Sequence, residues 1–371
     1  MNIKVITRHG PSNYGSLLQS IATVKVLKQL GYDVSIIDYQ RKDERGYGII
    51  RSQLKTKDKI ANPIKKVAYA IIRYPVEKFA QIKFDKMRTR WLPMTKRVSD
   101  YRQLEELKAD IFMTGSDQVW GPTMSGNYDP AYFLKFVDNE TPKVAYAASF
   151  GKTKFGEETI NAYKQLLSRY DKIAVREESA VSILRDWGLK NSVGQVLDPT
   201  LLLNSEEWDS TIHFTDTNHN KGKRYILLYL IHGNSSHIDY AKRMAKETGM
   251  QLINVNPFFH RVLNAGHFIC CPDVAEFLSL INEATFMITD SFHGTCFAIN
   301  LNKQFVELLP HNGTSTRNQS ILGLTNLTNR IVSDLNDLNW EDRIIDYSHI
   351  NDILSKERNK SINIIKDLIE E

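Results

Sequence analysis

The sequence has few cysteines and no long hydrophobic run. Only three of its 371 residues are cysteine, and Cys270, Cys271 and Cys296 have neither the Cys-x-x-Cys spacing of a zinc site nor the density of a secreted disulfide framework. Apolar stretches are interrupted well before the roughly 18 residues that a membrane-spanning helix needs. Met1 leads directly into a strand-like segment rather than a signal peptide. We therefore expect a cytoplasmic protein with reduced, buried cysteines.

Three kinds of site motif are also missing. The first strand-to-helix loop lacks GxGxxG, so a dinucleotide is not indicated. No cluster of His, Asp and Glu has metal-ligand spacing, so we expect no metal and no cofactor. Neither a DNA-reading helix nor an aromatic RNA platform is recognisable, which argues against nucleic acid as a partner.

The pattern that is present is a repeated alternation of strand and helix. Residues 1–39 predict one βαβ unit, and further strands are expected at 111–114, 144–147 and 173–175. The pattern restarts near residue 190, with strands at 225–230, 251–255 and 286–289 and helices at 238–248 and 274–284. Alternation of this kind builds parallel sheets, and a chain of this length exceeds one core. We predict an α/β fold with two Rossmann-like domains, 1–192 and 193–344, and a helix at 345–371 that packs back on the first.

The net charge of +5 conceals a basic segment. Residues 41–102 contain 18 Lys and Arg against 6 Asp and Glu, so the rest of the chain is net acidic. Apolar residues recur at helical spacing inside it, among Lys65, Lys66 and Arg73. Two interpretations are open: a solvated helix packed on its domain, or a peripheral contact with the inner membrane surface or a lipid-diphosphate carrier.

Polar residues that directly follow predicted strands are the first candidates for a site, because open parallel sheets bind ligands there. The segment DSFHG at 290–294 is the most informative. It places Asp, Ser and His at the start of a helix, where an imidazole such as that of His293 can exchange a proton with a substrate. The plainer alternative is that Asp290 or Ser291 caps the helix and His293 makes one structural hydrogen bond.

Other candidates concern anions and sugars. Arg176 also follows a strand and has the donor geometry for a carboxylate or phosphate, unless it pairs with Glu177 or Glu178 at the surface. Residues 312–318 form either an anion-binding loop with Arg317 or a plain turn. Trp120 and Tyr14 either stack on sugar rings or pack in the core.

Six motifs occur together and in order: NYG at 13–15, TGSDQVW at 114–120, YAASFG at 146–151, VREES at 175–179, LDPT at 197–200 and ITDSFHG at 288–294. With them the chain resembles the polysaccharide pyruvyl transferase family over nearly its full length. The resemblance implies a glycosyltransferase-B-like fold whose two domains face a cleft. It also implies phosphoenolpyruvate as the donor co-substrate, a pair of saccharide hydroxyls as the acceptor, and a pyruvate ketal in a cell-surface polysaccharide as the product.

The family pattern places the catalytic histidine at His293 and a donor-binding arginine at Arg176. Many members carry Arg two positions before the histidine, where this chain has Ser291, so we expect Arg317 to supply the missing cation. The expected donor-binding residues are Arg176, Ser291, Gly294, Arg317 and Asn318. From sheet geometry, the acceptor residues are expected in the first domain: Asn13, Tyr14, Gly15, Ser116, Asp117, Gln118 and Ser149.

Two other functions are compatible with the same sequence. One is a nucleotide-sugar-dependent glycosyltransferase with Glu276 on the ribose, since a fold does not fix a function. The other is a non-catalytic saccharide-binding assembly protein. For the transferase, we expect His293→Ala and Arg176→Ala to fold normally and to lose activity.

Overall fold

The chain divides into two compact units. A computed structural model describes residues 1–56, 62–123, 126, 128–217, 222–261, 265–309, 315–339 and 344–370. Unit 1 comprises Met1–Leu202 and Arg358–Glu371, and unit 2 comprises Leu203–Glu357. The division falls after Leu202 rather than after residue 192, because residues 192–202 belong to the first sheet and its edge.

Unit 1 contains a six-stranded parallel sheet in the order β2-β1-β3-β4-β5-β6. Every pairing in it is parallel. Its strands are β1 (Asn2–Ile6), β2 (Asp33–Ile36), β3 (Ile111–Thr114), β4 (Lys143–Ala148), β5 (Lys172–Val175) and β6 (Ser192–Gln195). The sheet is connected by α1 (Tyr14–Gln29), α2 (Tyr47–Thr56), α3 (Pro63–Trp91), α4 (Tyr101–Glu105), α5 (Glu157–Leu167) and α6 (Glu178–Asp186), with short 3-10 turns η1 (Lys42–Glu44), η2 (Pro130–Phe133) and η3 (Pro199–Leu201).

Unit 2 contains a five-stranded parallel sheet in the order β11-β10-β7-β8-β9. Its strands are β7 (Tyr225–Tyr229), β8 (Gln251–Asn256), β9 (His267–Cys270), β10 (Phe286–Thr289) and β11 (Gln304–Glu307). Its helices are α7 (Ser205–Ile212), α8 (Ser235–Thr248), α9 (Val274–Glu283), α10 (Phe292–Asn300) and α11 (Ser315–Leu324), with η4 (Phe259–Arg261) and η5 (Thr328–Arg330). The last helix, α12 (Tyr347–Glu370), begins in unit 2 and ends in unit 1.

The central strands are buried on both faces because helices cover both sides of each sheet. All residues of β3, β4, β7 and β10 are buried. A strand covered on both faces is a continuous apolar run rather than an alternating one, and YILLY in β7 has this form. The predicted fold class, α/β with two Rossmann-like domains, is confirmed.

Three strands were absent from the prediction, and each lies away from the centre of its sheet. β6 is an edge strand in which every residue is only half-buried, and β9 and β11 are the edges of the second sheet. Edge strands lack the long apolar run that identified the central strands. As a result, the start of the predicted second domain, at residue 193, falls inside β6, and η3 follows it.

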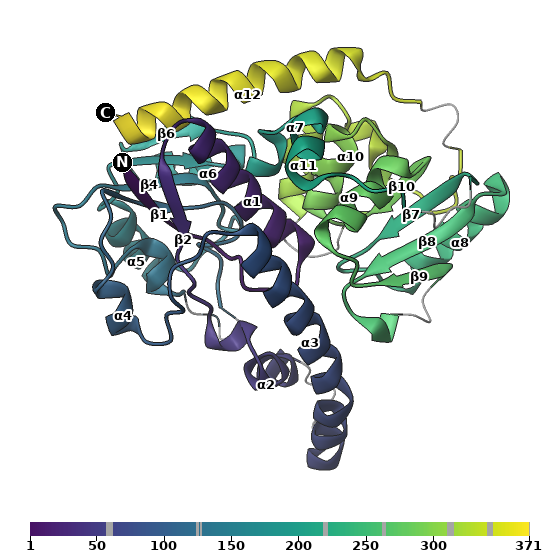
Figure 1. The fold of residues 1–371 in the computed structure, drawn as a ribbon, viewed down its shortest axis with the longest axis horizontal. Helices are drawn as coiled ribbons and strands as arrows, with labels where there is room; N and C mark the ends of the chain where they lie inside the picture. The colour runs from purple at the N-terminus through teal and green to yellow at the C-terminus, as the bar shows by residue number, and fades with distance from the viewer. Residues whose placement is uncertain are drawn as a thin grey trace. The chain divides into compact units, whose positions relative to one another are not determined.

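Helix α3 occupies the middle of the basic segment, residues 41–102. Its C-terminal half buries Val76, Ala80, Phe84 and Met87 at helical spacing against unit 1. Its N-terminal half extends away from the sheet with α2 beside it (Figure 1). The apolar residues of that half are exposed, so the interpretation of a face packed on the domain is wrong for them.

Candidate active site

In each sheet the order in which strands are added switches from one side of the unit's first strand to the other. We call the point of this switch the reversal position. In unit 2 the chain adds β8 and β9 on one side of β7 and then places β10 on the other. The connections that leave β7 and β10 therefore diverge, and open parallel sheets bind ligands in the crevice outside such carboxyl ends. The corresponding position in unit 1 lies between β1 and β3.

Asp290, the residue after β10, braces this position in unit 2. Its carboxylate oxygens accept hydrogen bonds from the backbone N–H groups of Ile231, at 2.6 Å, and His232, at 2.9 Å. Burial raises the pKa of Asp290 to about 6, although the two N–H groups and the charge of Arg261 act in the opposite direction. The side chain thus holds the end of β10 to the loop that follows β7.

Ser291 caps α10. Its hydroxyl accepts a hydrogen bond from the N–H of Gly294 at 3.2 Å, and only 2% of the residue is exposed. This is the arrangement of an N-cap serine. The structure therefore supports the capping alternative for Ser291.

Gly294 is required by close packing. A Cβ atom at this position would lie 2.4 Å from Thr289 Oγ1 and 3.1 Å from Tyr229 Cδ1. Real side chains do not tolerate the shorter distance. Gly294 therefore lets α10 approach the ends of β7 and β10 closely, and this approach, rather than a donor contact, accounts for the glycine.

His293 and Arg317 lie near the same aromatic ring. His293 occupies the first turn of α10, and its ring centroid is 5.0 Å from that of Phe292. The Arg317 guanidinium carbon, from the first turn of α11, lies 5.7 Å from the centroid of the Phe292 ring. Two separate helices, α10 and α11, thus place an imidazole and a cation near one aromatic ring. Residues 312–314 of the predicted anion loop lie outside the described residues.

A buried acid, Glu307, lies beside α10 and α11 and is hydrogen-bonded to both. Glu307 ends β11, accepts a hydrogen bond from Asn318 Nδ2 at 2.6 Å, and also accepts one from the Thr295 hydroxyl. Burial raises its pKa well above the usual range. Asn318 is only 1% exposed, so its side chain fixes Glu307 and is not placed to bind a donor.

His232 belongs to the same region and was not predicted. Burial lowers its pKa, and the charge of Arg317 lowers it further, so the two side chains share one electrostatic environment. It lies three residues after β7, so its position just past a predicted strand is the same sequence signal that identified His293. Glu307 was not predicted as a site residue, because the strand that it ends, β11, was not predicted. Glu276, proposed for a ribose, lies in the first turn of α9.

In unit 1, Asp117 occupies the reversal position. Its φ is 76°, a left-handed conformation that residues other than glycine seldom adopt. Its carboxylate accepts hydrogen bonds from the Ser16 hydroxyl, at 2.7 Å, and from the Gln118 N–H, at 2.8 Å. The Ser149 N–H donates to the Asp117 carbonyl at 3.1 Å. The structure thus brings three predicted acceptor residues together, and strained backbone of this kind is concentrated at functional sites.

Arg176 is buried in an ion-pair network. It contacts Asp198 at 2.7 Å and Glu177 at 3.0 Å, and Asp198 also accepts from the Ser116 hydroxyl at 2.8 Å. Burial alone would lower the pKa of Arg176, but the two carboxylates outweigh it and raise the pKa. Two buried carboxylates therefore offset its charge, and it lies in unit 1, whereas His293 and Arg317 belong to unit 2.

The remaining predicted acceptor residues lie around the start of α1. Asn13 caps this helix, accepting from the N–H groups of Gly15 at 2.8 Å and Ser16 at 3.3 Å. Tyr14 is fully buried and packs on Phe84, with ring centroids 5.0 Å apart. Tyr14 is thus a core residue, and Trp120, also fully buried, is another. Neither is available to stack on a sugar.

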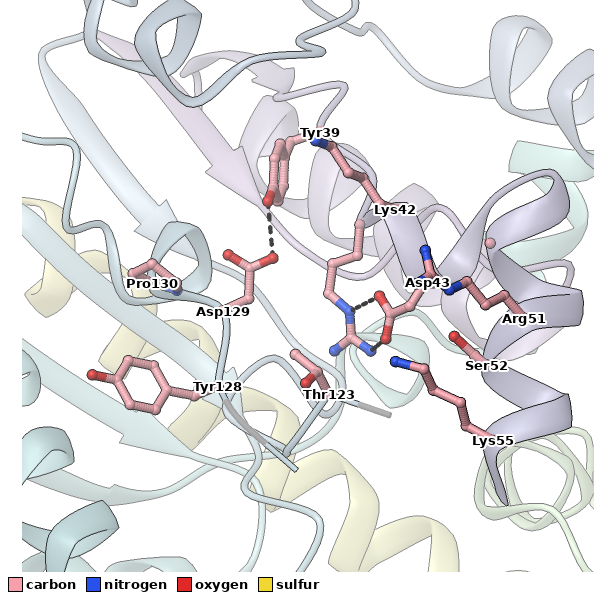
Figure 2. Close-up of a pocket in the computed structure, with 12 residues that line it drawn as sticks. Tyr39, Lys42, Asp43, Arg51, Ser52, Lys55, Thr123, Tyr128, Asp129 and Pro130 are labelled. Atoms are coloured by element: carbon pink, nitrogen blue, oxygen red, sulfur yellow. Dashed lines mark hydrogen bonds and ion pairs between the residues drawn. The ribbon is translucent and has the colours of Figure 1, made fainter. Parts of the chain in front are cut away.

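A basic hollow of about 580 Å³ lies beside the ends of β2 and β3 (Figure 2). Figure 2 shows Lys55 and Ser52 of α2 on one side of this hollow. On the opposite side, the Tyr39 hydroxyl donates a hydrogen bond to Asp129 at 2.9 Å. Arg41 in its wall pairs with Asp43. Within the described part of the chain, Lys42, Arg51 and Lys55 form no ion pair, so this hollow favours an anionic group.

The family model for polysaccharide pyruvyl transferase matches residues 13–312, a range that includes Asp117 and Asp290. The chain belongs to the polysaccharide pyruvyl transferase family. Among curated proteins, none matches the sequence of this family member at a significant level.

Solved structures of sugar-nucleotide enzymes are similar to this pyruvyl transferase family member. The Staphylococcus aureus MnaA–UDP structure has a TM-score of 0.56 at 16% identity and covers 100% of this chain and 98% of its own. The UDP-GlcNAc 2-epimerases of Neisseria meningitidis, bound to UDP-GlcNAc, and Methanocaldococcus jannaschii have TM-scores of 0.54 and 0.52, each at 14% identity with 100% of both chains covered. At such identities the likeness concerns the fold, which is of the glycosyltransferase-B type.

Among the residues that the structure describes, no three His, Cys, Asp or Glu side chains are grouped so that they could hold a metal ion. Across the described ranges, no helix is both long enough and apolar enough to cross a bilayer.

Proposed function

We propose that this protein transfers the enolpyruvyl unit of phosphoenolpyruvate to two hydroxyls of a saccharide and forms a pyruvate ketal. Family membership supports a transferase of this kind. The observation that carries the specific reaction is the placement of Arg317 and His293 near the Phe292 ring, at the reversal position of unit 2. Phosphoenolpyruvate is an anion that must be protonated on carbon, and this pair supplies a cation and a proton donor.

The proposed transfer takes place in two additions to C2 of phosphoenolpyruvate. His293 donates a proton to the methylene carbon, C3, while the first acceptor hydroxyl adds to C2 and its own proton passes to the histidine. The bond between C2 and the phosphate oxygen then breaks, and the second hydroxyl adds to C2. Its proton leaves with the phosphate, so one phosphoenolpyruvate and one diol give one ketal and one hydrogen phosphate.

We assign the donor to unit 2 and the acceptor to unit 1. On the donor side only His293 and Arg317 remain of the predicted residues in unit 2, because Ser291, Gly294 and Asn318 have structural contacts of their own. On the acceptor side we propose Asp117, Gln118 and Ser149, which converge at the reversal position. We place the reaction in the cytoplasm and the product in a cell-surface polysaccharide.

The test incubates the purified protein with phosphoenolpyruvate and a panel of cell-surface oligosaccharides. Mass spectrometry should detect the added pyruvate, with release of an equal amount of phosphate. His293→Gln should lower kcat by roughly 100-fold or more because it removes the proton donor. Arg317→Gln should raise KM for phosphoenolpyruvate by about tenfold or more, since it removes a charged hydrogen-bond donor. His349→Gln and Arg224→Gln are matched controls at exposed positions of unit 2.

The same preparation distinguishes the two alternatives. Thermal stabilisation by UDP or UDP-GlcNAc, but not by phosphoenolpyruvate, would indicate a nucleotide-sugar enzyme. Stabilisation by oligosaccharide alone, without phosphate release from any mixture, would indicate a binding protein. Near-native turnover by His293→Gln would rule out the proposed role of the histidine even if the ketal forms.

A further inference from the structure

Helix α3 has two apolar faces, and only one of them is packed. The packed face contains Val76, Ala80, Phe84 and Met87. On the opposite side of the helix the exposed fractions are 79% for Ile64, 59% for Val67, 68% for Ile71 and 46% for Ile82. These four residues are 3, 4 and 11 positions apart, which places them along one line at 3.6 residues per turn. We call this line the outer stripe.

Basic side chains surround the outer stripe. The exposed charged residues of α3 are all basic: Lys65, Lys66, Lys78, Lys83, Lys86 and Arg90. Its two acidic residues have basic partners within the same helix, since Glu77 pairs with Arg73 and Asp85 pairs with Arg88. The face around the stripe is therefore net positive, since its one partly exposed acid, Asp85 with 46% of its side chain exposed, is paired with Arg88.

We propose that the outer stripe docks on the surface of an anionic lipid bilayer. An apolar stripe flanked by Lys and Arg is what a helix lying in the interface requires: the apolar residues enter the acyl boundary and the basic ones contact anionic headgroups. A second copy of the chain is a poorer occupant. Pairing two outer stripes would bring two sets of six exposed cations together, with only the ion-paired Asp85 of each helix to offset them.

The docked helix would be mechanically coupled to the acceptor side of unit 1. Near its C-terminal end, Arg88 donates hydrogen bonds to the carbonyls of His9 at 3.2 Å and Pro11 at 3.3 Å. Both carbonyls belong to the loop that precedes α1. At the other end, the Tyr69 hydroxyl donates to Gln53 at 2.9 Å and so ties α3 to α2. The surface that contacts the bilayer is therefore part of a braced element rather than a loose segment.

The experiment is co-sedimentation of the full chain with vesicles of phosphatidylcholine alone or with 30% phosphatidylglycerol, a fraction set at roughly that of an anionic leaflet. The protein should bind the anionic vesicles at least tenfold more tightly, and 0.5 M salt should reverse most of this binding. Ile64→Ser with Ile71→Ser should reduce binding about tenfold, and so should Lys78→Glu with Lys83→Glu. All four positions are exposed, so the melting temperature should not change.

The matched control makes the same change of charge on a different helix. Lys242→Glu with Lys246→Glu, on exposed positions of α8, should leave vesicle binding within twofold of the unmodified protein. Equal loss in this control, or equal binding to neutral and anionic vesicles, would overturn the proposal. Light scattering provides a second check: a dimer that becomes a monomer in Ile64→Ser/Ile71→Ser, without vesicle binding by either, would show that the stripe binds a second copy instead.

Discussion

At the scale of single residues, the contacts of Arg176 alter what its removal would test. Arg176 and Asp198 are both almost fully buried and 2.7 Å apart. Removing one member of such a pair leaves an uncompensated buried charge, which costs about 3–5 kcal/mol. Arg176→Ala should therefore lower the free energy of unfolding by about that amount in urea titrations, contrary to the expectation that it folds normally.

The neighbouring helix provides a control for this prediction. Arg185 and Asp186 are 3.7 Å apart, and both are about 70% exposed, at 73% and 70%. Exposed pairs contribute about 1 kcal/mol or less, so Arg185→Ala should change the unfolding free energy little. A small effect of both substitutions would mean that the Arg176 network contributes little to stability, and that loss of activity in Arg176→Ala reports on function.

Asp290 should make the stability of the protein depend on pH in an unusual direction. Its pKa is about 6 in the folded state against 3.8 ordinarily, so between these values the folded state binds more protons than the unfolded state. Its contribution to the unfolding free energy therefore decreases as pH rises, by about 3 kcal/mol in all. Relative to Asp290→Asn, the unmodified protein should lose most of this amount between pH 4 and pH 6 in urea titrations. A difference that stays constant over this interval would contradict the assignment.

At the scale of elements, α10 depends on a glycine in its first turn. A methyl group at Gly294 would lie 2.4 Å from Thr289 Oγ1, so α10 must shift or the strand end must yield. Gly294→Ala should destabilise the protein by about 1–3 kcal/mol and lower kcat, because His293 lies in the same turn. Chemical denaturation and a phosphate-release assay measure the two effects.

The same substitution in α11 is the control. A Cβ atom at Gly323 would meet nothing within 4 Å, and the residue lies inside a helix. Gly323→Ala should therefore be neutral or stabilise the protein by up to about 1 kcal/mol. Destabilisation by both substitutions to a similar extent would show that the close approach at Gly294 is not the cause.

At the scale of the whole molecule, α12 contributes to both units. In unit 2 the Tyr347 hydroxyl donates to the carbonyl of Lys303. In unit 1 the Ser361 hydroxyl accepts from the Leu197 N–H at 3.0 Å, and Ile365, Leu368 and Ile369 are buried. The last 14 residues thus complete unit 1 although unit 2 separates them from it in sequence.

This arrangement predicts that a substitution near the C-terminus destabilises the N-terminal unit. Ile365→Ala should lower the unfolding free energy by about 2–5 kcal/mol, the range for truncating a buried isoleucine. Lys366→Ala, at the next and exposed position, should change it little. Hydrogen exchange should show the loss of protection in β5 and β6 of unit 1; protection lost only in unit 2 would contradict the assignment of this helix segment.

The sequence by itself determined the α/β class, the central strands, and the family to which the chain belongs. These follow from local patterns: continuous apolar runs for strands buried on both faces, helical spacing between them, and short motifs at strand ends. His293 was identified as a candidate in this way, and Arg317 from the composition of the loop at 312–318. Local sequence specifies local structure well where burial is complete, as in β3 and β10, which have the predicted bounds.

The tertiary structure alone decided which of the candidate residues already have structural roles. Ser291, Gly294, Asn318, Arg176 and Tyr14 matched or adjoined motifs, but each is occupied by a cap, a close contact, a buried acid or the core. Their partners come from distant parts of the chain, and nothing in a linear pattern records such contacts. The exposure of one face of α3 is decided in the same way. Both faces are apolar in sequence, and only the packing of unit 1 determines which of them remains available to a partner.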